Sequence, residues 1–334
     1  MKEKGEEMGF DDIIGQTEIV NTLKRAVKND HAGHAYVFSG PEGIGKGMMA
    51  EAFARQLLCL EADAPERCEG CTACRLLDEG TNPDFIVIRP SGSSIGIDEI
   101  RGIQSDIIIK PLYSRRKVYV IVNADLMTVQ AQNCLLKILE EPPRYAVIIL
   151  TVSNYNALLE TIRSRTIRYN FKRNSIEEVT GLLRERFGSS LKGIDFIAAY
   201  SGGIIGTALK LAESEEFISL RDRTIDMVFR IANSGLDAIF DIYDFFDENK
   251  DNINTVLDIM QMVYRDIMLL KTNQKENMLI NYDKKDIILS NADAFTVQKL
   301  IRNIELVEQT YRNLKYNANF QLSIEAMLMK LQED

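Results

Sequence analysis

Residues 35–47 read AYVFSGPEGIGKG, an apolar run that passes directly into a glycine-rich loop containing Lys46. The apolar run predicts a short buried strand, and the residues after the loop predict a helix that extends to about Cys59. A strand, a Gly-x4-Gly-Lys loop and a helix in this order are the setting of a phosphate-binding loop, whose backbone N–H groups and lysine hold phosphate oxygens. The candidate nucleotide-binding residues are Gly40, Gly43, Gly45, Lys46 and Gly47.

The loop lacks the side chains that hold magnesium. A phosphate-binding loop continues with Ser or Thr, whose hydroxyl binds Mg²⁺, whereas this chain has Gly47. The predicted strand Val118–Val122 leads into Asn123 where a metal-binding Asp and a water-activating Glu would stand, and in an extended register Asp125 lies too far along. Because phosphoryl transfer depends on positioning and charge neutralisation, we expect no intrinsic ATPase activity and at most weak ATP binding at Lys46.

Strand and helix patterns alternate through the first half of the chain. Helical spacing covers residues 16–29, 98–110 and 128–141, and strand patterns cover 85–88, 118–122, 146–152 and, more weakly, 166–171. Strands that alternate with helices predict a parallel sheet with helices on both faces. The sequence therefore predicts the α/β fold class for residues 1–172.

The strand signal fades after Phe171. Ser175 with Glu178 predicts a capping box that opens a helix, and Ser201-Gly202-Gly203 breaks the chain before a helix over 205–212. Nearly everything from about residue 215 has helical spacing, with helices predicted at 218–233, 236–248, 252–271, 295–313 and 317–332. We predict a small helical domain at 173–214 and a helical bundle at 215–334.

Four cysteines fall close together with the spacing C-x8-C-x2-C-x2-C. They are Cys59, Cys68, Cys71 and Cys74. Four thiolates around one ion form a closed tetrahedral site, which is the structural rather than the catalytic pattern of zinc. We therefore predict a structural Zn²⁺ held by a knuckle over residues 59–74, with Glu66, Arg67 and Glu69 exposed. Free thiols and an iron–sulfur cluster are the alternatives.

Composition and charge limit the function classes. The 334 residues are 46% apolar and 27% charged, and no apolar run approaches the ~18–20 residues that span a bilayer. The charged N-terminus does not resemble a signal peptide, so we expect a cytoplasmic protein without a membrane partner. The net charge of −9 argues against broad binding to nucleic-acid backbones. Basic residues nevertheless outnumber acidic ones over 101–172, and they include Arg115, Arg116, Lys117, Arg163, Arg165 and Arg168.

Several motifs together resemble the bacterial clamp-loader AAA+ family of DNA polymerase III. They are HAYVFSGPEGIGK at 34–46, the four-cysteine insertion, KVYVI at 117–121, NCLLKILEEPP at 133–143 and IRSRT at 162–166. The resemblance covers residues 10–172 strongly and the rest weakly. It implies an AAA+ P-loop domain, a small helical lid domain and a C-terminal helical collar for oligomerisation. It also implies zinc in the insertion and a role in DNA replication, within a hetero-pentameric ring.

The resemblance also implies partners and residue roles. The partners are clamp-loader ATPase subunits and a delta subunit, with the sliding clamp and primed DNA reached through the assembly. Ser164 and Arg165 match the Ser-Arg-Cys motif, whose arginine enters a neighbouring subunit's ATP site, although the third residue here is Thr166. The family's ATPase subunits carry an arginine that senses the γ-phosphate where this chain has Gly206. These matches imply a member with a degenerate nucleotide site that supplies Arg165 as an arginine finger in trans.

Other interpretations stay open. Arg165 could serve only as a surface ion-pair residue. The whole chain could instead be a self-sufficient AAA+ ATPase that acts as a motor subunit, which predicts ATP turnover by the purified protein. It could also be a zinc-dependent nucleic-acid-binding module, which predicts salt-sensitive DNA binding by the isolated chain.

Overall fold

The structure, a computed structural model, describes residues 9–61, 68, 70–188, 191–235, 238–272 and 278–333. It divides into two compact units, which are described separately. The first unit comprises Met1–Val179 with Gly203–Thr207, and the second comprises Thr180–Gly202 with Ala208–Asp334.

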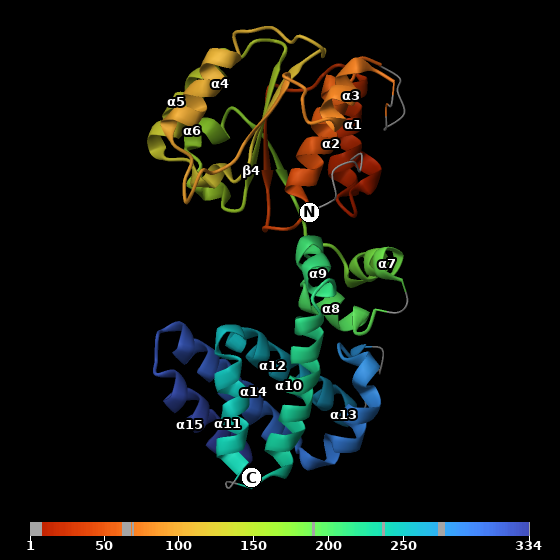
Figure 1. The fold of residues 1–334 in the computed structure, drawn as a ribbon, viewed down its shortest axis with the longest axis vertical. Coiled ribbons are helices and arrows are strands. Elements are labelled where there is room, and N and C mark those ends of the chain that lie inside the picture. The colour runs from red at the N-terminus through yellow and green to blue at the C-terminus, as the bar shows by residue number, and fades with distance from the viewer. Residues whose placement is uncertain are drawn as a thin grey trace. The chain divides into compact units, whose positions relative to one another are not determined.

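The first unit is built on a five-stranded parallel sheet (Figure 1). The strands are β1 (Ala35–Ser39), β2 (Phe85–Ile88), β3 (Lys117–Ile121), β4 (Ala146–Val152) and β5 (Ile167–Asn170), in the spatial order β2-β3-β4-β1-β5. Because all strands run the same way, the segments that follow their carboxyl ends meet along one edge of the sheet. The loop after β1, which contains Lys46, lies at that edge.

Helices cover both faces of this sheet (Figure 1). The helices of this unit are α1 (Thr17–Lys28), α2 (Lys46–Leu58), α3 (Thr72–Asp78), α4 (Ile97–Asp106), α5 (Val129–Glu140) and α6 (Glu160–Arg163). Side chains of α4 and α5 share a buried cluster with Ile148 and Leu150, whereas side chains of α1 and α2 share another with Val147 and Ile149. Successive residues of β4 therefore point to opposite buried faces, which explains why all of its residues except Thr151 are apolar.

The predicted α/β fold class is confirmed. The strands at 35–39, 85–88 and 146–152 have the predicted bounds, and the remaining two strands differ from the predicted bounds by one residue at each end. The helix predicted over 98–110 ends earlier, at Asp106. The ammonium of Lys117 donates to the carbonyl oxygen of Asp106 (3.1 Å), the last residue of the helix, and to that of Ile109 (3.5 Å) in the segment that follows.

The second unit is helical in all its described regular structure. Its helices are α8 (Ile194–Tyr200), α10 (Glu215–Asn233), α11 (Ile239–Glu248), α12 (Ile253–Lys271), α13 (Lys285–Asn291), α14 (Val297–Lys315) and α15 (Phe320–Gln332). Helix α12 packs between α10 and α14, and α15 packs against α14 and α11. A helical C-terminal region is therefore confirmed, although spacing alone missed the short helices α8 and α13.

The segment predicted as a small helical domain, 173–214, contributes residues to both units. Helix α7 (Ile176–Phe187) begins with the predicted capping box, since the N–H of Ser175 donates to Glu178 (2.8 Å) and the N–H of Glu178 donates to the hydroxyl of Ser175 (3.1 Å). Helix α9 spans Ile205–Ala212, as predicted. The division into three domains stays a prediction.

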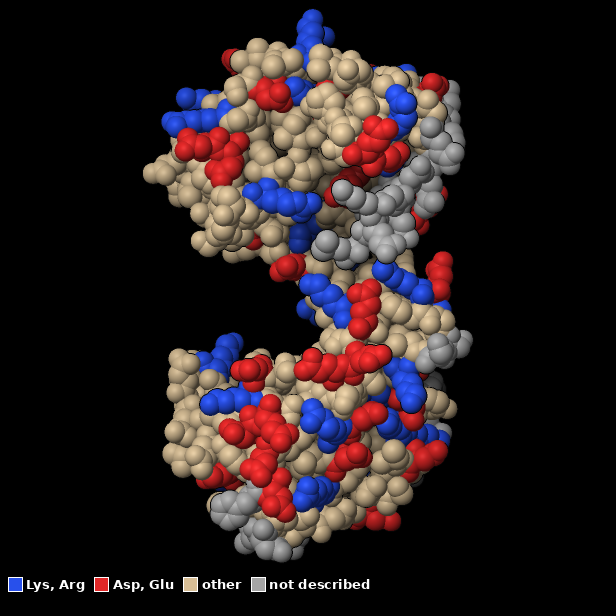
Figure 2. Space-filling view, viewed as in Figure 1, with Lys and Arg blue, Asp and Glu red and all other residues tan. Residues whose placement is uncertain are grey.

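None of the described helices combines the length and the apolar character needed to cross a membrane. Figure 2 shows acidic and basic side chains interspersed on the visible face of both units.

Candidate functional site

The loop after β1 has the backbone of a phosphate-binding loop. Gly43 and Gly45 adopt φ of 78° and 103°, in the left-handed region that favours glycine, and α2 begins immediately afterwards at Lys46. An added Cβ at Gly45 or Gly47 would meet nothing within 4 Å, so the loop itself leaves room for a ligand there. The structure thus brings Gly40, Gly43, Gly45, Lys46 and Gly47 together as one loop and helix terminus.

The side chain of Lys46 turns back onto this loop. Its ammonium donates to the carbonyl oxygens of Gly40 (2.6 Å) and Pro41 (2.8 Å) and lies 3.5 Å from the hydroxyl of Ser153. The residue is 6% exposed, and burial lowers the pKa of the lysine against the opposing effect of the nearby Asp125 and Glu42 carboxylates. The lysine that would reach phosphates is therefore paired with carbonyls of its own loop.

The carboxyl end of β3 provides no carboxylate in the first two positions after the strand. Asn123 there adopts φ of 54°, and the turn directs Asp125 toward the end of β4. One oxygen of Asp125 accepts the N–H groups of Ser153 (3.2 Å) and Asn154 (3.0 Å), whereas its other oxygen is buried with no hydrogen bond among the described residues. The prediction from the sequence assumed an extended chain after β3 and therefore missed that Asp125 and Lys46 both contact Ser153.

The start of α9 packs directly on the phosphate-binding loop. The N–H of Gly206 donates to the carbonyl oxygen of Gly43 at 2.9 Å. A Cβ on Gly206 would lie 2.8 Å from that oxygen, and a Cβ on Gly43 would lie 3.1 Å from the side chain of Ile204. The close approach of α9 to the loop therefore requires glycine at positions 43 and 206. Position 206, where the family resemblance would place a phosphate-sensing arginine, has no room for a side chain.

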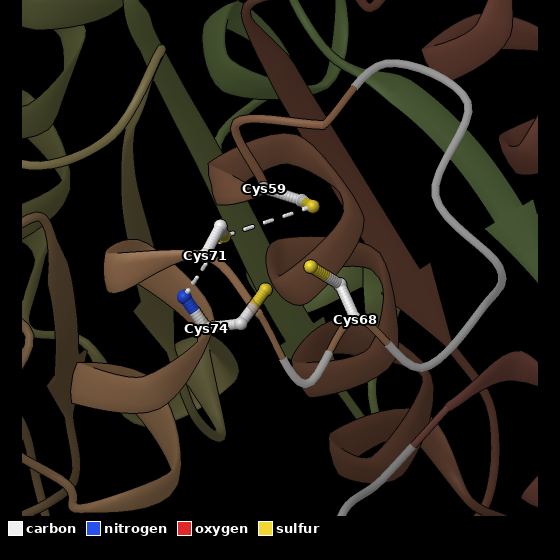
Figure 3. A group of neighbouring side chains, drawn as sticks. All are labelled: Cys59, Cys68, Cys71 and Cys74. Carbon is white, nitrogen blue, oxygen red and sulfur yellow. Dashed lines mark hydrogen bonds between the residues drawn. The ribbon is translucent and has the colours of Figure 1, made fainter.

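The four cysteine thiols converge (Figure 3). All four residues are buried, and their sulfur atoms lie within 4.8 Å of one another, with Cys59 and Cys71 at 4.0 Å. Cys59 caps the C-terminus of α2, and Cys71 caps the N-terminus of α3 while accepting the N–H of Cys74 (3.4 Å). Cys74 thus lies in the first turn of α3. The predicted exposed residues Glu66, Arg67 and Glu69 lie outside the described residues.

This arrangement fits a metal ion. Four sulfur atoms at ~2.3 Å from one tetrahedral ion would lie about 3.8 Å apart, close to the 4.0 Å between the sulfur atoms of Cys59 and Cys71. Burial raises the pKa of Cys59 to about 11 and raises that of Cys74 as well. Burial also acts to raise the pKa of Cys71, but N–H groups of Leu60 and Cys74 outweigh it and lower that pKa to about 7. A bound cation deprotonates its thiol ligands, and its positive charge would offset the repulsion between the four thiolates that this produces.

Arg165 lies on the surface, just after α6. Its guanidinium donates to the carbonyl oxygen of Thr161 (3.1 Å) and lies 3.3 Å from a carboxylate oxygen of Glu140, and its side chain is 38% exposed. The hydroxyl of Ser164 lies 3.5 Å from the same guanidinium. Thr166, which departs from the motif, directs its hydroxyl to the carbonyl of Ile162 (3.1 Å) and leaves the guanidinium accessible.

Sequence reasoning missed one candidate interaction surface, the apolar loop 107–113. Its side chains Ile108, Ile109, Leu112 and Tyr113 are 49–75% exposed. The fully buried carboxylate of Asp84 holds the loop by accepting the N–H groups of Leu112 and Tyr113, both at 2.8 Å. An exposed apolar group on a rigid backbone is typical of a protein contact. The run IIIKPLY at 107–113 was a signal for it.

The family models and the curated relatives that match this chain agree on one family. The family model described as "DNA polymerase III, delta subunit" matches residues 15–175, and "DNA polymerase III, delta subunit, C terminal" matches 215–333. DNA polymerase III subunit delta' of Bacillus subtilis is 30% identical over 322 residues, covering 95% of this chain and 96% of that protein. Subunit tau of the same organism is 27% identical over 345 residues, covering 96% of this chain but only 61% of that protein.

Solved structures give a weaker likeness. A DNA polymerase III gamma subunit-related protein of Thermotoga maritima superposes with a TM-score of 0.46 at 20% identity, covering 93% of this chain and 98% of that one.

Proposed function

Because the chain belongs to the family of DNA polymerase III clamp-loader subunits, we propose that it is a delta-prime-type subunit of that assembly. In this role it helps to load the sliding clamp on primed DNA during replication. Its partners are the clamp-loader ATPase subunits and a delta subunit, in a hetero-pentameric ring. It hydrolyses no ATP itself and serves as an accessory subunit of the polymerase complex.

The composition of the phosphate-binding loop and its surroundings carries this proposal. Gly47 offers no hydroxyl for Mg²⁺, and β3 is followed by Val122 and Asn123 rather than carboxylates. The nearest carboxylate, on Asp125, uses one oxygen to accept two backbone N–H groups. A site without these groups can neither neutralise the transferring phosphoryl group nor activate water.

We propose that Arg165 acts in trans on the ATP site of a neighbouring subunit. Its exposure supports this role, since a guanidinium must leave the surface of its own subunit to reach a phosphate. The ion pair with Glu140 is between exposed side chains and is therefore worth at most about 1 kcal/mol, a small cost to break. An arginine in this role stabilises charge on the transferring group and contributes about 10³–10⁵ in rate.

We propose that the four cysteines hold a structural Zn²⁺. The closed set of four thiolates leaves no ligand position for water, so the ion supplies folding energy rather than hydrolytic chemistry. The buried convergence of the four sulfur atoms supports this assignment.

Reconstitution tests the proposed role. The full chain is mixed with the other clamp-loader subunits of its host, and complex formation and DNA-stimulated ATP hydrolysis are measured together. Arg165→Ala should assemble normally and slow hydrolysis at the neighbouring ATP site by a factor of about 10³ or more, which lowers the total turnover of the complex. The matched control is Arg163→Ala, because that neighbouring guanidinium bonds Asn156 (3.4 Å) within its own subunit. Unchanged hydrolysis with Arg165→Ala would contradict the proposal.

The same preparation tests the competing functions. A self-sufficient ATPase predicts turnover by the chain alone that disappears in Lys46→Ala. A zinc-dependent nucleic-acid-binding module predicts DNA binding that disappears when Cys71 and Cys74 are replaced. We expect no turnover by the chain alone.

A further inference from the structure

A cleft of about 530 Å³ lies on the first unit, at the edge of the sheet opposite to the phosphate-binding loop. Arg115 and Arg116 directly precede β3, and Arg144 and Tyr145 directly precede β4, and all four line the cleft. The phosphate-binding loop instead follows the carboxyl end of β1. Because the strands are parallel, the two sites occupy opposite edges and are separate.

The lining of this cleft is positively charged in a chain whose net charge is −9. Lys28 joins the three arginines, and the acidic residues of the lining are Asp30 and Glu61. Four cations thus face two carboxylates, and the excess suits a ligand with about two negative charges.

Two of the arginines are fixed in position. Arg116, whose side chain is 16% exposed, donates to the carboxylate of Asp30 at 2.6 Å, and this hydrogen bond lowers the pKa of the Asp30 carboxyl. Arg115 donates to the carbonyl oxygen of Leu60 at 2.6 Å. Guanidinium groups held in this way lose little conformational freedom when a ligand binds.

The two other cations are not neutralised within the described part of the chain. Neither the side chain of Lys28 nor that of Arg144 has a hydrogen bond or ion pair there, although both residues line the cleft. Their charges are therefore available to a ligand, whereas the charge of Arg116 is already shared with Asp30.

We propose that this cleft binds the phosphate of a nucleotide, supplied either as a free nucleotide or by a single-stranded nucleic acid. Guanidinium forks match phosphate oxygens in pairs. Val27, Ala32 and Leu57 give the lining an apolar part, and the ring of Tyr145 is oriented because its hydroxyl donates to the carbonyl oxygens of Ile107 (2.9 Å) and Ile108 (3.1 Å). Such surfaces accept a base or sugar. The cleft volume lies within the range of about 300–1,000 Å³ that is usual for small-molecule sites. The proposed clamp-loader role makes no use of this site.

Equilibrium binding to the full chain, without magnesium, tests the proposal. The probes are deoxyadenosine monophosphate, a short oligothymidylate and an oligoglutamate peptide. Arg144→Ala and Lys28→Ala should each weaken nucleotide or oligonucleotide binding by about tenfold or more, because each removes a charge-assisted contact. The control Arg312→Ala removes an exposed arginine from α14 in the second unit and should leave binding unchanged.

The outcomes separate the sites and the ligand sources. Binding of the mononucleotide identifies a free nucleotide as ligand, and binding of the oligonucleotide alone identifies a nucleic-acid strand. Binding that is lost in Lys46→Ala but kept in Arg144→Ala would assign the ligand to the phosphate-binding loop and overturn the proposal. Equal losses with Arg144→Ala and Arg312→Ala, binding of oligoglutamate alone, or no binding at all would also overturn it.

Discussion

The backbone N–H of Gly206 donates a hydrogen bond of 2.9 Å to the carbonyl oxygen of Gly43, so the start of α9 is fastened to the phosphate-binding loop. The contact joins segments that lie far apart in the sequence and belong to the same compact unit. It also accounts for glycine at position 206, because a Cβ there would lie 2.8 Å from the carbonyl oxygen of Gly43.

Gly206→Ala should therefore destabilise the protein. The atom that the new methyl group meets is backbone and cannot rotate away, so the segment 203–207 must move off the loop. Overpacking of this kind costs about 1–3 kcal/mol. The free energy of unfolding, measured with denaturant, checks the value.

Gly102→Ala is the matched control. Gly102 lies within α4, and a Cβ there would meet nothing within 4 Å. Alanine in place of an unhindered helical glycine should stabilise by about 0.5–1 kcal/mol. Equal effects of the two substitutions on the free energy of unfolding would contradict the role given to the Gly206 contact.

The cysteine cluster should bind one zinc ion that Cys74→Ser abolishes. The four cysteines form a small buried cluster of their own with Ala73, separate from the two clusters that flank the sheet. Loss of the ion should thus speed amide hydrogen exchange in α3 while the strands stay protected. Metal analysis and hydrogen exchange measure the two effects.

Cys134→Ala provides the control for loss of a cysteine. Cys134 is also buried, but it packs in the α5 face of the sheet and lies outside the four-thiol cluster. This variant should keep its full zinc content. A zinc content that falls equally in both variants would argue against the cluster as the binding site.

Zinc affinity should rise with pH. Burial raises the pKa of Cys59 to about 11 and that of Cys74 too, so both thiols are protonated at neutral pH in the metal-free protein and must release protons on binding. Release of at least these two protons raises the affinity about a hundredfold or more per pH unit. The slope should steepen below about pH 7, where Cys71 is protonated as well. Competition with a chelator at several pH values measures the slope, and a flat profile would rule out thiolate ligation.

Much of the first unit could be predicted because its strands are continuous apolar runs between recognisable turns. The strand at 146–152 was found to the residue, since both of its faces are buried and every position except Thr151 is apolar. The early end of α4 was not predicted from helical spacing, which takes no account of the ammonium of Lys117 in the following strand that accompanies it.

The sequence identified residues of the phosphate-binding loop and the cysteine cluster, but not the contacts that these residues make. Spacing identified Lys46 as part of a phosphate-binding loop, yet the carbonyl oxygens that its ammonium contacts depend on the folded loop. The proximity of Asp125 follows from the left-handed turn at Asn123, which no periodicity encodes. The arginine-lined cleft was also missed, because α1 and the segments before β3 and β4 are far apart in the sequence.

A buried arginine should control the stability of the helical unit. Arg221, in α10, is 0% exposed, and its guanidinium donates to the amide oxygen of Asn281 (2.9 Å and 3.1 Å) and to both carboxylate oxygens of Asp283 (2.6 Å and 2.8 Å). It also lies 4.3 Å from the ring centre of Phe196, in α8. One side chain thus joins three segments that helical spacing treats as independent.

Arg221→Met should lower the free energy of unfolding by about 3–5 kcal/mol, because it leaves Asn281 and Asp283 without their buried donor. Arg221→Lys should recover only part of this loss, since an ammonium cannot reproduce the planar fork that serves both acceptors. Arg312→Ala, which breaks an exposed pair with Glu308 on α14, should change the value by no more than about 0.5 kcal/mol. Denaturant unfolding of the three variants measures their free energies of unfolding and so tests this order. Full recovery of stability in Arg221→Lys would show that the positive charge, rather than the geometry of the guanidinium fork, holds α8 against α10.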